Sequence, residues 1–160
     1  MTRLYDKIIN IELLDEAASE QFAIRLAQCL VAPLVLAFSG AIGAGKTTII
    51  RAMLKNKGIK SAIKSPTFSL VESYQCADVQ LHHFDLYRLN NAAELDYLGF
   101  RDYFTEQSIC CIEWAEHAGR ALPNVDIRFK LSIKGAGREM QIEALSAAGE
   151  KMIACLAGEQ

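Results

Sequence analysis

The chain has 160 residues, of which 51% are hydrophobic and 22% charged, and this size and composition predict one domain, residues 1–160, with a substantial core. The formal net charge of −2 and a pI near 5.9 exclude an overall basic field, so any contact with RNA should be local or shared with a partner. No apolar run reaches the roughly 20 residues of a membrane span and no export signal is visible, so we expect no membrane attachment.

The first half of the chain alternates predicted strands and helices. Residues 7–13 alternate loosely between apolar and polar side chains, which predicts a strand, and residues 15–30 carry apolar side chains at helical spacing. Residues 34–38 form a short apolar run, which is typical of a strand buried on both faces. After a glycine-rich loop, residues 47–57 predict a helix that ends at Gly58.

The middle of the chain predicts two paired strands followed by helical segments. A short turn separates residues 68–74 from residues 79–84, so we expect these two strands to be antiparallel. Residues 91–98 predict a helix, residues 108–112 another buried strand, and residues 113–120 a short helical turn.

The C-terminal part of the chain predicts a hairpin and a closing helix. Residues 127–145 alternate between apolar and polar side chains on both sides of Gly135 to Gly137, and residues 146–156 have helical character. Together these elements predict an α/β sandwich around a mixed parallel and antiparallel sheet.

The glycine-rich loop has the pattern of a nucleotide-binding loop. Residues 40–47 satisfy G-x-x-x-x-G-K-[ST], and they follow an apolar strand and precede an amphipathic helix. Such a loop closes around phosphates with its backbone N–H groups, while Lys46 reaches the β- and γ-phosphates and the Thr47 hydroxyl ligates Mg²⁺. The alternative is a turn that only packs the strand on the helix. The expected nucleotide-binding residues are Gly40, Ala41, Ile42, Gly43, Ala44, Gly45, Lys46, Thr47 and Thr48.

With this loop, the predicted fold class is an α/β, P-loop NTPase-type three-layer sandwich with a mixed sheet and a C-terminal β-hairpin. A triphosphate site of this type needs an acidic residue at the end of a neighbouring buried strand. Asp85 and Glu113 both stand where an apolar strand ends. We expect one of them to hold Mg²⁺ and the other to orient or deprotonate a water that attacks the γ-phosphate, and the sequence does not assign the two jobs. His83 is expected to be a hydrogen-bonded structural residue.

Thr67 is a further candidate catalytic residue. Pro66 fixes its own φ and pushes Ser65 into an extended conformation, which leaves Thr67 on an irregular loop before a strand. A rigid hydroxyl there could sense the γ-phosphate or the metal, as ordered loops do in switch NTPases. The alternative is an ordinary turn threonine.

The only dense basic stretch follows the predicted nucleotide-binding loop. It consists of Lys55, Lys57, Lys60 and Lys64. Cations at a helix C-terminus explain such a stretch through the helix dipole, and we prefer this interpretation slightly to a contact with RNA or a protein partner.

The five cysteines show no C-x-x-C pair and no zinc-ligand spacing. We therefore expect reduced thiols and a cytoplasmic protein. Cys110 and Cys111 lie in an apolar run, where they are predicted to be small core residues.

Five segments resemble the motifs of a known protein family, and they occur in the same order and at the same spacing. They read GAIGAGKTT, SPTFSLVESY, HHFDLYRL, AAELDYLGF and CCIEWAEH. With them the chain resembles the TsaE family of small bacterial P-loop ATPases, which are accessory proteins of tRNA threonylcarbamoyladenosine synthesis. The resemblance is strong over about residues 34–124 and holds only in outline outside them.

The resemblance implies a cytoplasmic protein that binds ATP and Mg²⁺, hydrolyses ATP slowly alone and acts with the TsaD and TsaB proteins. That complex would transfer threonylcarbamoyl to the adenosine next to the anticodon, and this chain would meet tRNA only indirectly or through the complex. The resemblance assigns phosphate binding to Lys46, and Mg²⁺ binding or hydrolysis to Thr47, Asp85 and Glu113. It places Thr67, His83, Tyr87, Arg88 and Trp114 in the site or on the partner surface.

Ala41 departs from the family pattern, which usually has an acidic residue at this position. The loop amides and Lys46 remain, so phosphate binding should be preserved. Nothing in the sequence explains the replacement.

Three other functions use the same residues. A small-molecule kinase would use Asp85 or Glu113 as the base and Arg88 to stabilise the transferred phosphoryl group, but little chain is left to form a substrate domain. A GTPase is disfavoured because N-K-x-D is missing and neither candidate acid, Asp85 or Glu113, stands in a D-x-x-G pattern. A module that keeps ATP without turnover remains open.

Overall fold

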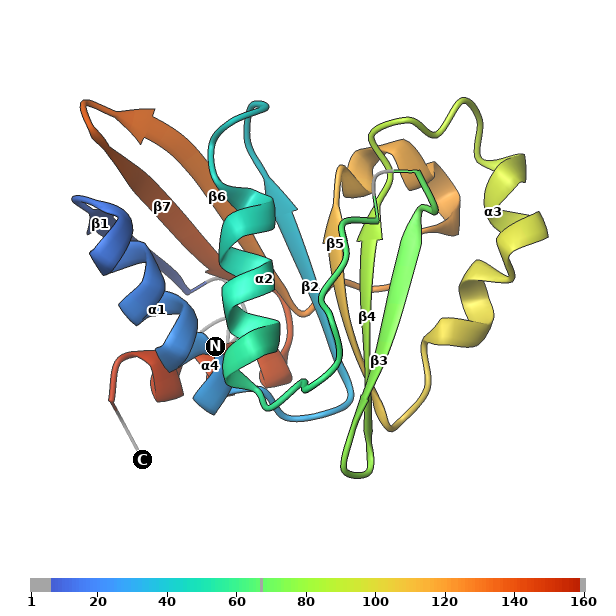
Figure 1. Cartoon of the computed structure of the whole chain (residues 1–160), viewed down its shortest axis with the longest axis horizontal. Coiled ribbons are helices and arrows are strands. Elements are labelled where there is room, and N and C mark those ends of the chain that lie inside the picture. Colours follow the sequence, from blue (N-terminus) through green and yellow to red (C-terminus); the bar gives the residue numbers. More distant parts are fainter. Residues whose placement is uncertain (1–6, 67, 159–160) are drawn as a thin grey trace, which may run out of the picture.

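The computed structural model describes residues 7–66 and 68–158, and Figure 1 shows how their helices lie against one twisted sheet. Thr67 therefore lies outside the described residues. The elements in chain order are β1 (Ile8–Leu13), α1 (Glu16–Gln28), β2 (Leu34–Ser39), α2 (Lys46–Asn56), β3 (Val71–Cys76), β4 (Val79–Asp85), α3 (Ala93–Leu98), the 3₁₀ helix η1 (Phe100–Tyr103), β5 (Ser108–Glu113), the 3₁₀ helix η2 (Ala115–Ala121), β6 (Ile127–Lys134), β7 (Gly137–Ala144) and α4 (Ala147–Leu156).

The seven strands form one sheet in the order β1-β7-β6-β2-β5-β4-β3. Strand β2 pairs in parallel with β5 and β6, and β5 pairs in parallel with β4. The flanks are antiparallel, because β3 pairs with β4, β7 with β6 and β1 with β7. The predicted mixed sheet and the C-terminal hairpin β6–β7 are confirmed.

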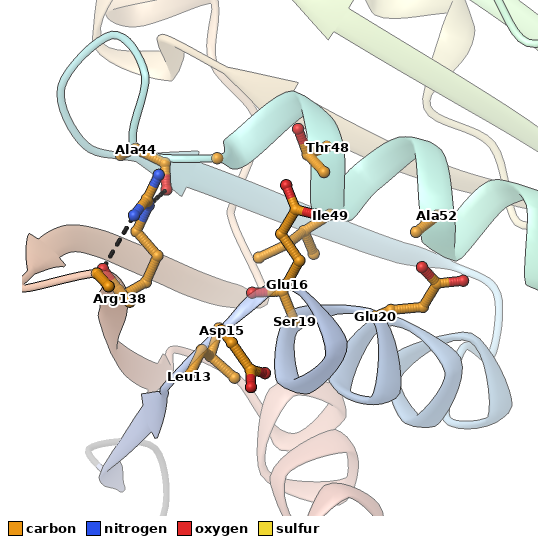
Figure 2. A pocket seen from close by; sticks show the side chains of 13 residues that line it. Leu13, Asp15, Glu16, Ser19, Glu20, Ala44, Thr48, Ile49, Ala52 and Arg138 are labelled. Carbon is orange, nitrogen blue, oxygen red and sulfur yellow. Dashed lines mark hydrogen bonds between the residues drawn. The ribbon is translucent and has the colours of Figure 1, made fainter.

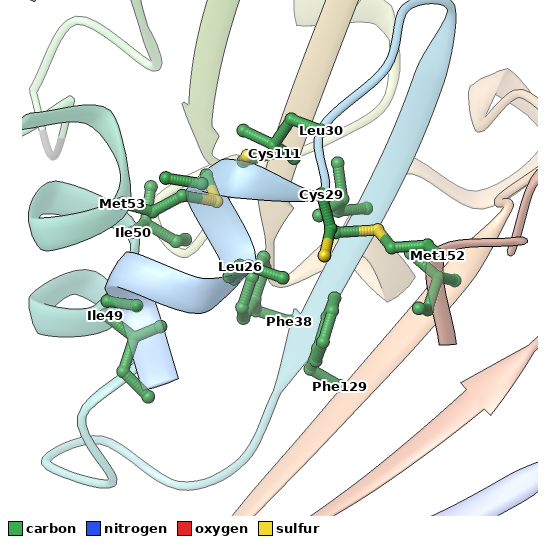
Figure 3. Close-up of a cluster of buried hydrophobic side chains, with 14 of the residues drawn as sticks. Leu26, Cys29, Leu30, Phe38, Ile49, Ile50, Met53, Cys111, Phe129 and Met152 are labelled. Atoms are coloured by element: carbon green, nitrogen blue, oxygen red, sulfur yellow. The ribbon is translucent and has the colours of Figure 1, made fainter. Parts of the chain in front are cut away.

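The core lies on both faces of the sheet. Successive side chains of a strand point to opposite faces, so Phe38 joins the cluster under α1, α2 and α4, while Ala37 joins the cluster under α3 and the 3₁₀ helices. Figure 3 shows Leu26 of α1 beside Phe38 and Phe129, whose rings stack with centroids 4.6 Å apart. Helix α2, which follows the glycine-rich loop, contributes to the same cluster and therefore packs on the centre of the sheet.

Local signals in the sequence explain several element ends. Asp15 caps α1, since its carboxylate accepts a hydrogen bond from the Ala18 N–H at 2.8 Å. Ser146 caps α4 by accepting from the Gly149 N–H. Gly99 ends α3 with a φ of 71°, a left-handed conformation that glycine adopts without a steric penalty.

Two segments differ from the sequence-based expectation. The strand expected from Phe68 begins only at Val71, because Leu70 takes a left-handed conformation and its N–H bonds back to the Pro66 carbonyl at 2.8 Å. The helical turn expected from Glu113 begins at Ala115, because Glu113 still pairs within the sheet as the last residue of β5.

The expectation of reduced thiols is wrong for one pair of cysteines. Cys29, at the C-terminal end of α1, forms a disulfide with Cys155 of α4, 126 residues away. Sequence spacing carries no signal for such a pair, because only the packing of α1 and α4 on the same face brings the two residues together. Cys110 and Cys111 are buried free thiols, as expected, and burial raises the pKa of Cys110 to about 12. Within the described ranges no helix has the length and apolar character needed to cross a membrane.

Candidate phosphate-binding site

Three parallel strands end side by side at one edge of the sheet. Glu113, the last residue of β5, is in register with Phe38 of β2 on one side and with Asp85 of β4 on the other. The glycine-rich loop leaves β2 at this same edge. Open α/β sheets bind their ligands at the carboxyl ends of parallel strands, so the sheet order itself brings both predicted acids to the loop.

The glycine-rich loop needs glycine at particular positions. Gly43 and Gly45 have φ values of 85° and 103°, which are left-handed conformations. Gly40 has a φ of 138°, and a Cβ atom there would collide with the Leu131 carbonyl oxygen of β6. The loop therefore lies tightly against the sheet before α2 begins at Lys46.

Lys46 is buried at the mouth of this loop, with only 5% of its surface exposed. Its ammonium group donates a hydrogen bond to the Gly40 carbonyl and stands 4.3 Å from the ring centroid of Trp114. A cation over an aromatic face is attracted by the ring quadrupole. Trp114 takes a left-handed conformation, with a φ of 58°, directly after β5. The buried cation is thus held between the loop and the end of β5.

A chain of three side chains runs from α2 into the sheet. The Thr47 hydroxyl contacts both carboxylate oxygens of Glu113, at 2.8 and 2.9 Å. The second oxygen of Glu113 also lies 2.6 Å from Nε2 of His83, and both residues are almost fully buried. The Thr47 hydroxyl donates to this carboxylate, and His83 shares a hydrogen bond with it. His83 thereby fixes the rotamer in which Glu113 faces Thr47.

Asp85 is placed differently from Glu113. It is 9% exposed, and its Oδ1 accepts a hydrogen bond from the Tyr87 N–H at 3.1 Å, which closes the turn after β4. Glu113 lies on the strand adjacent to β2, whereas Asp85 lies one strand further out. Asp85 and Glu113 are register neighbours, but of the two only Glu113 contacts the Thr47 hydroxyl.

The donor set fits a magnesium ion that shares its coordination with phosphates. Mg²⁺ prefers oxygen ligands and is usually held by one or two carboxylates together with substrate phosphates and water. Thr47 and Glu113 offer a hydroxyl and a carboxylate in contact, and Asp85 offers a second carboxylate on the next strand. Within residues 7–66 and 68–158, His, Cys, Asp and Glu side chains form no group of three or more that could hold a metal without such help.

Arg138 of β7 is a site residue that the sequence analysis missed. Its guanidinium group donates to the Ala44 carbonyl at 2.8 Å, as Figure 2 shows, and to the Gly43 carbonyl at 3.2 Å. These contacts tie the loop to the C-terminal hairpin. No motif could reveal them, because about 95 residues separate Arg138 from the loop and only the sheet order brings them together.

A cavity of about 350 Å³ adjoins the loop beside Arg138. It lies between the start of α1, the loop, the first turns of α2 and the hairpin (Figure 2). Its lining includes Leu13, Glu16, Ala44, Thr48 and Arg138. Thr48, the last of the predicted nucleotide-binding residues, faces this side, whereas Thr47 faces Glu113.

The other residues named by the family resemblance lie at two places. The Tyr87 ring packs on Trp114 with centroids 5.0 Å apart, so these two aromatic side chains stand together beside Lys46. The guanidinium carbon of Arg88 lies 4.9 Å from the ring centroid of Phe68, which is 85% exposed. Arg88 thus packs on an exposed ring of the loop before β3.

Comparisons with known proteins agree on one family. A family model described as "Threonylcarbamoyl adenosine biosynthesis protein TsaE" matches residues 13–142. The chain is 38% identical to the "tRNA threonylcarbamoyladenosine biosynthesis protein TsaE" of Haemophilus influenzae, over 87% of this chain and 91% of that protein. It is 34% identical to the protein of the same name from Bacillus subtilis, over 73% and 72%. The crystal structure of Bacillus subtilis YdiB covers 98% of both chains with a TM-score of 0.80 at 24% identity, which shows a shared fold.

Proposed function

We propose, from the premise that this chain belongs to the TsaE family of tRNA threonylcarbamoyladenosine biosynthesis proteins, that residues 1–160 work as one P-loop ATPase domain. The family is required for making threonylcarbamoyladenosine in tRNA. The finer proposal is that the chain binds ATP with Mg²⁺, hydrolyses it slowly and uses the cycle to control its partners. The observation that carries it is the direct contact of Thr47 with the buried carboxylate of Glu113 beneath a loop of the phosphate-binding pattern.

In this proposal the loop amides and Lys46 bind the β- and γ-phosphates, because the N-terminus of α2 adds partial positive charge at the same place. Thr47 and Glu113 hold Mg²⁺, which when bound neutralises charge that develops on the phosphates. His83 keeps the Glu113 carboxylate turned toward Thr47 through the 2.6 Å hydrogen bond. Asp85, one strand away, orients the water that attacks the γ-phosphate.

The cavity beside Thr48 and Arg138 is proposed to accept the nucleoside of ATP. Its volume of about 350 Å³ lies at the lower end of the usual range for small-molecule pockets. The cavity lies on the side of α2 that carries Thr48, whereas Glu113 lies on the side that carries Thr47, so base and metal would sit on different sides of the phosphates. Arg138 contributes to both parts, since it holds the loop and lines the cavity.

The partners proposed for the ATP cycle are the TsaD and TsaB proteins in the cytoplasm. Two exposed apolar side chains frame the site, Ile42 at the loop and Tyr87 after β4, with 69% and 44% of their surfaces exposed. Ordering of loops by a γ-phosphate is a common way to change the affinity of an NTPase for a partner. Hydrolysis would then release or reset a protein contact rather than phosphorylate a small molecule.

The test is ATP turnover by the purified chain with Mg²⁺, alone and with a bacterial TsaD and TsaB pair. We expect slow turnover that the pair raises many-fold and that Lys46→Ala abolishes in both conditions. If the turnover rate does not change when TsaD and TsaB are added but rises many-fold with one metabolite, the proposal is contradicted and a kinase is indicated. Tight ATP binding without turnover in any mixture would contradict the hydrolytic part alone.

A further inference from the structure

The end of α2 remote from the phosphate-binding loop is strongly basic. Residues 51–64 contain Arg51, Lys55, Lys57, Lys60 and Lys64 and no acidic residue, in a chain whose formal net charge is −2. We name these five residues the basic end of α2. The charge is therefore concentrated at one place on a molecule that is otherwise acidic.

The helix dipole explains only part of the basic end. Helix α2 ends at Asn56 with Lys57 as its C-cap, and the dipole acts within the last turn of a helix. Lys55 and Lys57 satisfy this condition. Lys60 and Lys64 lie in the non-helical segment beyond the helix, where the dipole gives no reason for a cation.

The backbone that carries the basic end is anchored, while its lysines have no acidic partners among the described residues. The Lys64 N–H donates to the Tyr74 hydroxyl at 2.9 Å, and the Cys76 thiol donates to the Lys57 carbonyl. Within residues 7–66 and 68–158, none of the four lysines forms an ion pair. Lys134 of the hairpin shows the contrast, since it pairs with two glutamates.

The surface at the basic end is hollowed. A cavity of about 480 Å³ lies between α2 and the segment that follows it, and its lining includes Arg51, Lys55, Lys60 and Ser61. Among the described residues that line it, Glu20 of α1 is the one acidic residue. Exposed cations around a hollow with a fixed backbone provide several donors for one extended anion.

We propose that the basic end of α2 binds the phosphate backbone of RNA. The family to which the chain belongs acts in tRNA modification, which favours a tRNA as this polyanion. The proposal thereby departs from the expectation, implied by the resemblance, that the chain meets tRNA only indirectly or through the complex. The inference depends on this family role and not on ATP hydrolysis. The two ends of α2 are about 16 Å apart, from the rise per residue of a helix, so one molecule can hold ATP at one end and RNA at the other. The contact is local because the rest of the chain is acidic. It is salt-dependent because lysines that neutralise phosphates release bound counterions.

The test measures binding of the full-length protein to a fluorescently labelled tRNA transcript at several salt concentrations between about 50 and 200 mM. The variant is Lys55→Gln combined with Lys60→Gln. The matched control is Lys130→Gln combined with Lys151→Gln, which removes the same charge at two exposed lysines on β6 and α4. These two lysines also form no ion pair with any residue that the structure describes. ATP affinity is measured for every protein as a check on the fold.

We expect the variant to lose about tenfold in tRNA affinity at the lowest salt and to reduce the slope of log K against log salt by about 2, one for each lost phosphate contact. The control should lose no more than about twofold, as a uniform charge effect predicts. Equal losses in the variant and the control would overturn the proposal. So would unchanged tRNA affinity together with weaker TsaD and TsaB binding, which would indicate a protein surface instead. A variant that binds tRNA weakly but keeps its ATP affinity supports the proposal even if the chain proves to hydrolyse no ATP.

Discussion

The two ends of α2 carry cations in opposite physical states. At the N-terminal end, Lys46 is buried and is held by the Gly40 carbonyl and the Trp114 ring. At the C-terminal end, Lys55 and Lys60 are exposed and have no ion pair within the described chain. A cation that is desolvated must be held by fixed partners, whereas an exposed one acts through its field. The first arrangement suits one ligand in one geometry, and the second suits any phosphate backbone.

The strongest test of this contrast is Lys46→Ala. The change removes the buried cation while Gly43, Gly45 and the start of α2 remain, so the loop keeps its shape but loses its charge. We expect turnover to fall by at least about a hundredfold, the scale of losing one preorganised donor to transition-state charge. Steady-state turnover with saturating Mg²⁺ and far-UV circular dichroism give the rate and the fold. Unchanged MgATP affinity and turnover would show that the loop does not bind phosphate through Lys46.

The next test separates the two acids at the same end. We expect Glu113→Gln to raise the Mg²⁺ concentration needed for half-maximal turnover, because Glu113 contacts Thr47 and is held by His83. We expect Asp85→Asn to lower kcat about a hundredfold, because Asp85 is proposed to orient the attacking water. The Mg²⁺ requirement should change little, because Asp85 lies one strand further from Thr47 than Glu113 does. Turnover measured against Mg²⁺ concentration distinguishes the two. The opposite pattern would exchange the two roles, and full activity in both variants would refute the assignment.

A smaller effect is expected from Arg138→Ala, which acts on the loop from outside. Arg138 donates to the Gly43 and Ala44 carbonyls and lines the adjoining cavity. Losing these contacts should raise the KM for ATP by about tenfold with a smaller fall in kcat, since about 1.4 kcal/mol corresponds to a factor of ten. The control is Arg128→Ala, which removes an exposed arginine that pairs with Glu143 on the far face of the sheet. Equal KM changes in both variants would contradict a positioning role.

The smallest effect concerns the other end of the helix. Lys55→Gln combined with Lys60→Gln should change the free energy of unfolding by no more than about 0.5 kcal/mol, because exposed side chains without partners contribute little to stability. ATP turnover should be unchanged within about twofold. Urea unfolding and turnover assays check both values. A large loss of either would show that the basic end supports the fold or the ATP site, which would remove the contrast between the two ends.

Much of the fold could be predicted because local patterns agree with the tertiary structure. The capping carboxylate of Asp15, the left-handed Gly99 and the alternation in β6 and β7 all act within a few residues along the chain. The start of β3 was placed too early because the Leu70 N–H bonds back to the Pro66 carbonyl, a local contact that competes with strand propensity. The disulfide of Cys29 and Cys155 was missed because its two residues meet only through the packing of α1 and α4.

The sequence by itself determined the loop pattern of residues 40–47, the presence of two acids at strand ends, and the family through five ordered segments. These features depend on neighbours along the chain. Only the tertiary structure decided that Glu113, rather than Asp85, touches Thr47, because the sheet order places β5 next to β2 and β4 one strand further away. It alone brought Arg138 to the loop and left the lysines at the far end of α2 without an ion pair in the described part of the chain. The physical reason is that hydrogen bonds and ion pairs depend on distance in space, which the order of strands sets and the order of residues does not.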